Sequence, residues 1–179
     1  LENSELKFKE PFKGLFTQGM VCHETYKDEN NNWLNPEEVF SDDGKNFFLK
    51  KKPDQKIKVG PSESMSKSKK NTVDPETMIE QYGADAVRLF ILSDSPPEKD
   101  IQWSDSGMSS SYKFIQKFWS MSIELIKLKQ SEKSIELSEE IDVFTNQALD
   151  KINTSLEKFR YNVIIAVFHE IFNFYSKIL

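Results

Sequence analysis

The sequence predicts an α+β chain, with short strands and turns in its first half and an α-helical bundle in its second. Before residue 60, short apolar runs alternate with clusters of Asn, Asp, Ser and Gly, as in strands joined by turns. After residue 105, apolar residues recur at three- and four-residue intervals, as in amphipathic helices. Two prolines at 96–97 separate these patterns, so we expect one domain over residues 1–95 and a second over 96–179.

The first apolar segments predict a buried strand and its approach. Residues 1–10 show no periodicity and are mixed and charged, so we expect an extended lead-in without a secretory leader. The apolar runs at residues 15–16 and 20–22 flank Gly19 and are too short for a helix. We therefore place the first core strand close to residue 20.

Turn-forming clusters mark the segment that follows this strand. Three asparagines occupy residues 30–32, and Ser-Asp-Asp-Gly occupies residues 41–44. The apolar residues at 46–49 then predict a further strand. We expect a small β insertion over residues 24–58, which carries the chain from the core strand to the next segment.

Residues 60–71, here called the signature loop, have the composition of a mobile cationic loop. Gly60 and Pro61 are expected to break regular structure, the serines can donate hydrogen bonds, and the lysines supply charge for an anion. Phosphate is the natural ligand for such a loop. A solvated loop without a ligand has the same composition, so this interpretation depends on the order of the residues.

Two short helices are predicted after the signature loop. Asp74 has the position of an N-cap and Pro75 that of a first helical residue, and Gly83 should end this helix. Asp85 is expected to cap a second helix and to pair with Arg88 at i,i+3, rather than to serve in an active site.

The second half of the chain predicts three helices with apolar faces. Such faces are far commoner as a bundle core than as surfaces for stacking bases. The apolar face of the last helix continues to the end of the sequence, which suggests a bundle that continues in a larger helical domain. The positions that carry the first two faces are Phe114, Phe118, Met121, Leu125, Ile141, Phe144, Ala148, Ile152, Leu156 and Phe159.

Composition limits the function classes. The net charge of −5 argues against a simple basic nucleic-acid binder, although residues 45–70 hold nine lysines against two acids. No apolar run is long enough for a membrane span, so the expected location is the cytoplasm, with no membrane partner. Cys22 is the only cysteine, and His23 and His169 lack partners at metal-ligand spacing. We therefore expect no metal site in the chain and a structural role for both histidines.

The order of residues in the signature loop resembles a known motif. Ser-Met-Ser-Lys-Ser at residues 64–68, followed by Lys-Lys-Asn, resembles the second signature of class I aminoacyl-tRNA synthetases, Lys-Met-Ser-Lys-Ser. Ser64 replaces the first lysine of that motif. Further segments resemble the sequence after this signature and the leucyl-tRNA synthetase branch, and together cover most of residues 10–120. These segments are residues 11–21, 73–76, 82–90, 93–98 and 103–105.

The resemblance implies a fold and an activity. Residues 1–95 would be the C-terminal part of a Rossmann-like catalytic domain, and residues 96–179 the start of a helical anticodon-binding domain. The full enzyme would activate leucine with ATP and Mg²⁺ and attach it to tRNA(Leu). Lys67 would be the catalytic cation on the ATP phosphates, and the basic residues Lys151, Lys158 and Arg160 would be candidate RNA contacts. The implied nucleotide-binding residues are Met65, Ser66, Lys67, Ser68, Met20 and Val21.

Two alternatives and one gap remain at this stage. The chain could belong to a class I synthetase for valine, isoleucine or methionine, or it could be a non-catalytic helical RNA-binding module. The family also carries a first signature, His-Ile-Gly-His, which the sequence does not contain. We therefore expect the isolated chain to be inactive.

Overall fold

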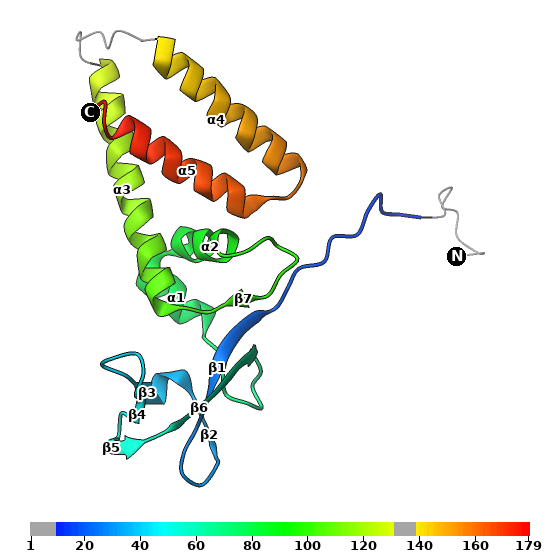
Figure 1. The fold of residues 1–179 in the computed structure, drawn as a ribbon, viewed down its shortest axis with the longest axis vertical. Helices are drawn as coiled ribbons and strands as arrows, with labels where there is room; N and C mark the ends of the chain where they lie inside the picture. Colours follow the sequence, from blue (N-terminus) through cyan, green and yellow to red (C-terminus); the bar gives the residue numbers. More distant parts are fainter. Residues whose placement is uncertain (1–9, 131–138) are drawn as a thin grey trace.

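The computed structural model describes residues 10–130 and 139–179, which form two small β-sheets and a set of α-helices (Figure 1). The lead-in predicted over residues 1–10 lies almost wholly outside the described residues. The first sheet contains β1 (Val21–Lys27), β2 (Trp33–Leu34), β6 (Lys58–Ser64) and β7 (Ile101–Gln102). The second contains β3 (Val39–Phe40), β4 (Phe48–Leu49) and β5 (Lys52–Lys56), preceded by the 3₁₀ helix η1 (Pro36–Glu38). The helices are α1 (Pro75–Tyr82), α2 (Ala84–Ser93), α3 (Asp105–Gln130), α4 (Glu139–Glu157) and α5 (Tyr161–Tyr175).

Strand β1 organises the first sheet. It pairs antiparallel with β6 along its length, antiparallel with β2 at its end, and parallel with β7 at its start. The predicted core strand near residue 20 is thus confirmed. Because β7 follows α2 in the sequence, the chain returns to β1 before the long helices begin (Figure 1).

The prediction that Gly60 and Pro61 break regular structure is wrong, because both lie within β6. His23 pairs with Glu63 and Thr25 with Gly60, so β6 has one additional residue there and forms a bulge. A bulge in a strand with one sheet neighbour tolerates a proline, which cannot donate a backbone hydrogen bond. Glycine is the residue that fits at position 60, because a Cβ there would collide with the Thr25 hydroxyl.

The β insertion packs on the first sheet through a small apolar core. Phe47 and Leu49 pack against a buried cluster that joins strands of both sheets, and the strand predicted at residues 46–49 is observed as β4. The buried cluster consists of Tyr26, Leu34, Val39 and Ile57.

The helix predicted after the signature loop is confirmed. The Asp74 carboxylate accepts a hydrogen bond from the Glu76 amide at 3.1 Å, and Gly83 ends α1. The predicted Asp85 cap is wrong, because the N-cap of α2 is Gly83, whose φ of 81° is unfavourable for other residues. Asp85 instead lies in the first turn and pairs with Arg88 at 2.9 Å, as expected.

The three later helices are also confirmed, and aromatic side chains join them. The rings of Phe144 and Phe174 stack at 3.8 Å between α4 and α5, and Phe114 of α3 contacts His169 of α5 at the same centroid distance. His169 thus has a packing contact in the bundle. Within the described ranges, no helix is both long and apolar enough to cross a bilayer.

Helix α2 links the two halves of the molecule. It packs against α1, α3 and α5, and its buried Phe90 forms a second apolar core with Ile101 and Met108. The chain on the two sides of residue 96 therefore shares a core. The division into domains 1–95 and 96–179 stays a prediction.

Candidate functional site

The signature loop leaves β6 beside the first residue of β1. The Met65 amide donates to the Val21 carbonyl at 3.1 Å, which extends the strand pairing by one bond. Residues 67–70 then form a turn, closed by a 3.3 Å hydrogen bond from the Lys70 amide to the Lys67 carbonyl. Lys70 has a φ of 53°, so the chain reverses at this residue.

Asn71, at the end of the signature loop, is fully buried with an exposed fraction of 0%. Its Oδ1 accepts a hydrogen bond from the Ser66 amide at 2.8 Å. Its Nδ2 donates to the carbonyls of His23 at 3.2 Å and Glu63 at 3.1 Å. One side chain thus connects β1, β6 and both ends of the turn, a role that the sequence analysis did not assign.

Lys67 lies at the exposed tip of the turn. Its side chain lines a cavity of about 510 Å³ between the signature loop, the start of α1 and η1 of the β insertion. In the part of the chain that the structure describes, Lys67 forms no ion pair. The other residues that line this cavity are Asn35, Glu37, Thr72, Val73, Asp74 and Pro75.

Lys69, two residues further on, has a carboxylate partner. Its ammonium group pairs with Glu63 of β6, and both side chains are about one-third exposed. Because Glu63 offsets part of its charge, Lys69 is a poorer substitute than a free lysine for the charge that the family motif carries at the position of Ser64. Ser64 itself is exposed at the end of β6.

The serines of the motif contact one another. The hydroxyls of Ser66 and Ser68 lie 3.2 Å apart, and the Lys69 amide donates to the Ser66 hydroxyl at 3.4 Å. Met65 is half-buried at the base. Ser68 and Lys67 are the exposed polar groups next to each other at the tip, and a hydroxyl beside an ammonium group suits a phosphate oxygen.

Met20 and Val21 lie at the base of the loop, away from its tip. The Met20 amide donates to Asp100 at 2.8 Å, its carbonyl accepts from Ile101 at 2.9 Å, and 55% of the residue is exposed. Val21 contacts the loop through Met65 but lines a different cavity from Lys67. The structure therefore brings Val21 and the loop together without placing it beside the Lys67 side chain.

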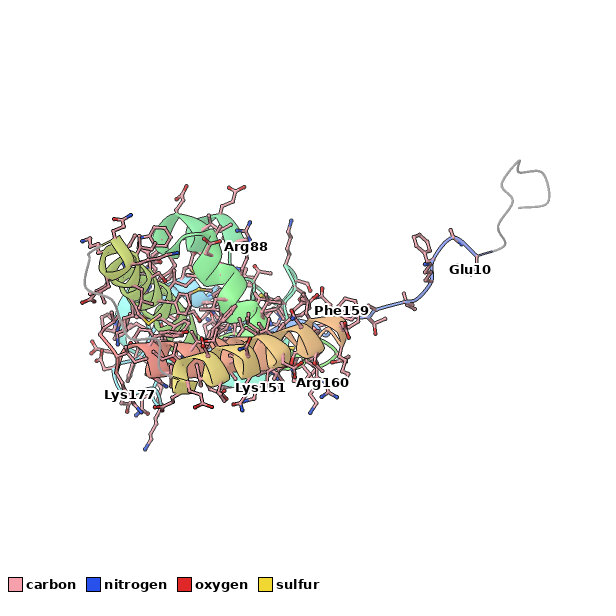
Figure 2. All side chains as sticks on the ribbon, turned by 90° about the horizontal axis from the view of Figure 1, so that it is seen from above. Glu10, Arg88, Lys151, Phe159, Arg160 and Lys177 are labelled. Carbon is pink, nitrogen blue, oxygen red and sulfur yellow. The ribbon has the colours of Figure 1, made fainter. Side chains whose placement is uncertain are left out.

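The candidate RNA contacts lie on the bundle. Figure 2 shows Lys151 and Arg160 on the outer surface of α4 and the turn that follows it. Lys151 pairs with Glu170 of α5 at 3.1 Å. Within residues 10–130 and 139–179, no three His, Cys, Asp or Glu side chains gather in a way that could hold a metal ion.

Comparison with known proteins connects this loop to one enzyme class. The family described as tRNA synthetases class I (I, L, M and V) matches residues 57–104, which include the whole signature loop and both helices after it. The chain is 47% identical over 172 residues to a leucine–tRNA ligase of Rickettsia bellii, and 46% identical over 173 residues to one of Wolbachia pipientis. These alignments cover 96% and 95% of the chain but only 20% of each relative.

A solved structure supports the same assignment. The chain resembles the agnB2 LeuRS of Agrobacterium radiobacter K84, whose crystal structure is a ternary complex with tRNA and LeuAMS. The TM-score is 0.55 at 27% identity, and the match covers 64% of this chain and 16% of that one. The chain thus spans about a fifth of the length of the curated relatives it matches.

Proposed function

We propose a function for this chain from one premise: by sequence it belongs to the leucine–tRNA ligases, within the class I tRNA synthetases. The proposal concerns what this fifth of such an enzyme contributes. It supplies the phosphate-contacting loop for activation of leucine by ATP, and part of the helical surface that binds tRNA(Leu), in the cytoplasm. The names of the relatives favour leucine over valine, isoleucine and methionine.

The activation step needs a positive group at one place. The leucine carboxylate attacks the α-phosphorus of ATP, the bond to the bridging oxygen breaks, and leucyl-adenylate and pyrophosphate form. Negative charge accumulates on the departing pyrophosphate, and a positioned ammonium group stabilises that charge without covalent chemistry. Mg²⁺, carried on the phosphate oxygens of ATP, would neutralise further charge.

Lys67 is the residue we assign to this role. The observation that supports it is a difference among the three lysines of the turn. Lys69 is paired with Glu63, and Lys67 is the one of the three that lines the cavity beside α1, where it forms no ion pair in the described chain. Ser66 and Ser68 would orient the turn or donate to phosphate oxygens, and Met65 would pack at its base. Met20 and Val21 remain proposed neighbours of the adenosine.

The helical half would bind tRNA. Arg160 and Lys158 are exposed just after α4, whereas Lys151 forms an ion pair with Glu170. Arginine and lysine at such positions neutralise phosphates, and the resulting affinity falls with added salt. We therefore propose Arg160 and Lys158 ahead of Lys151 as backbone contacts.

Lys67→Ala in the complete enzyme tests the catalytic assignment. We expect leucine-dependent ATP–pyrophosphate exchange to fall by roughly 10²-fold or more, the scale for loss of one transition-state donor. Lys51→Ala, which removes an exposed lysine of the β insertion, is the matched control and should leave the rate within about twofold. An unchanged exchange rate for Lys67→Ala removes this residue from the mechanism.

A separate titration distinguishes an enzyme part from a binding module. The complete protein is titrated with ATP and with tRNA in separate experiments, at two salt concentrations. Binding of both ligands agrees with the proposal. Salt-sensitive tRNA binding without ATP binding would instead identify a non-catalytic RNA-binding module.

A further inference from the structure

We propose that Asn71 is a positioning residue, which fixes the base of the signature loop so that the Lys67 ammonium is presented from a rigid support. The proposal rests on the proposed function of Lys67 and extends it to a residue that does not touch the substrate. On this proposal, the turn at residues 67–70 is the mobile part of the loop, whereas the first residues of the loop are held in place.

The bonding of Asn71 carries this inference. A buried polar side chain loses its water and is stable only with partners, and Asn71 has three within 3.2 Å. One partner is the Ser66 amide immediately before Lys67, and the others are carbonyls of β1 and β6. The residue thus joins the backbone on both sides of Lys67 to the central strand pair of the sheet.

No other side chain of this size can make the same bonds. Asparagine presents an acceptor and an amide with two donors on one carbon, and the site uses both kinds of group. Aspartate would keep the acceptor for the Ser66 amide but would place a charge against two carbonyl oxygens. Leucine would fill the space but could form none of the three hydrogen bonds.

An ion pair and a backbone hydrogen bond hold the turn next to the Asn71 hydrogen bonds. The Lys69–Glu63 pair holds the far side of the turn against β6, and the Lys69 amide contacts the Ser66 hydroxyl. Between these contacts, Lys67 and Ser68 are exposed. The loop therefore consists of a fixed base and a short free tip, and the tip carries the cation that the proposed reaction needs.

Such a support matters because the reaction depends on geometry. An ammonium group lowers the barrier only if it lies where charge develops on the leaving pyrophosphate, and a displacement of about 1 Å can cost on the order of 10²-fold in rate. Removal of Asn71 would leave Lys67 chemically intact but poorly placed. Substitution of Asn71 should therefore slow the activation step only in an enzyme that still has Lys67.

The test is a double-mutant cycle in the complete enzyme, with ATP–pyrophosphate exchange as the readout. We expect Asn71→Ala and Asn71→Asp to lower kcat by about 10-fold to 10²-fold when Lys67 is present. In the Lys67→Ala background the same substitutions should change the residual rate by less than about twofold, because the ammonium group that Asn71 is proposed to position is absent. Transfer of leucine from preformed leucyl-adenylate to tRNA should be unaffected.

The matched control is Asn146→Ala, since Asn146 is an exposed asparagine of α4 whose side chain donates to the Asp142 carbonyl of the same helix at 2.8 Å. It should leave exchange unchanged. If Asn71→Ala costs the same factor with and without Lys67, the residue serves stability alone and the inference is wrong. If Lys67→Ala has no effect, the proposed function fails instead, so the two failures are distinguishable.

Hydrogen exchange on the unmodified enzyme provides a measurement that does not depend on folded variants. The Ser66 amide, bonded to a buried acceptor, should exchange at least about tenfold more slowly than the Ser68 amide at the tip. Bound ATP should slow exchange at the tip and leave Ser66 unchanged. A Ser66 amide that exchanges as fast as Ser68 would overturn the inference even if no Asn71 variant can be purified.

Discussion

At the scale of the residue, Tyr26 shows how burial controls ionisation near the site. The residue is 6% exposed in the apolar core between the two sheets, and its hydroxyl donates to the Glu24 carboxylate at 3.0 Å. Burial, followed by the negative charge of Glu24, raises the pKa of Tyr26 well above its ordinary value. The phenol is therefore held protonated by the same packing that anchors β1.

This shift predicts a loss of stability in alkaline solution. A raised native pKa leaves stability intact below the unfolded value of about 10, and the free energy of unfolding falls above it, since only the unfolded chain releases the proton. Denaturant unfolding between pH 9 and pH 11 should show this fall, and Tyr26→Phe should reduce it. Tyrosinate absorbance in which all five tyrosines ionise together would contradict the prediction.

The two residues of the signature loop that carry our proposals differ in how far the sequence reveals them. Lys67 could be proposed because a short motif in a fixed order indicated it. Asn71 belongs to the same resemblance, but its burial depends on carbonyls of His23 and Glu63, of which the first lies 48 residues away. A contact of this kind is set by strand pairing, which local patterns do not encode.

At the scale of the element, local signals predicted helix starts well and strand limits poorly. Asp74 and Pro75 define the start of α1 through bonds within one turn. Gly60 and Pro61, in contrast, have the composition of a loop but belong to β6, because the bulge opposite β1 accommodates them. The Asp85 cap failed for a related reason, since Gly83 already serves both α1 and α2.

The N-cap of α1 allows a quantitative prediction. Asp74 accepts hydrogen bonds from the Glu76 amide and the Thr77 hydroxyl, each at 3.1 Å. Asp74→Ala should therefore lower the free energy of unfolding by about 1 kcal/mol, measured by urea denaturation, whereas Asp74→Asn should retain most of the cap. Equal losses for both variants would show that the carboxylate charge, and not the cap, stabilises this helix.

At the scale of the whole molecule, the fold class could be predicted but the contacts between its halves could not. The change from turn-rich to helical periodicity at about residue 100 is visible in the sequence. The packing of α2 on α3 and α5, and the return of the chain to β1 through β7, depend on residues far apart in the sequence. The sheet and the bundle are therefore more closely joined than the two prolines at 96–97 indicated.

The span of the chain relative to its relatives predicts what it can do alone. It aligns with 20% of a leucine–tRNA ligase and lacks the His-Ile-Gly-His signature of the family. We expect the 179-residue chain to show no leucine-dependent ATP–pyrophosphate exchange, since one cationic loop supplies only part of the transition-state stabilisation. The complete enzyme is the positive control, and turnover by the chain alone at ordinary enzyme concentration would refute the expectation.

The single cysteine gives the molecule a natural reporter. Cys22 is 4% exposed on β1, where it pairs with Ser64 on one side and Gln102 on the other. A thiol reagent can reach this buried sulfur only when the packing around β1 opens. The rate of covalent labelling in the chain therefore measures how often the structure around β1, which adjoins the signature loop, opens, with no engineered probe and no competing thiol.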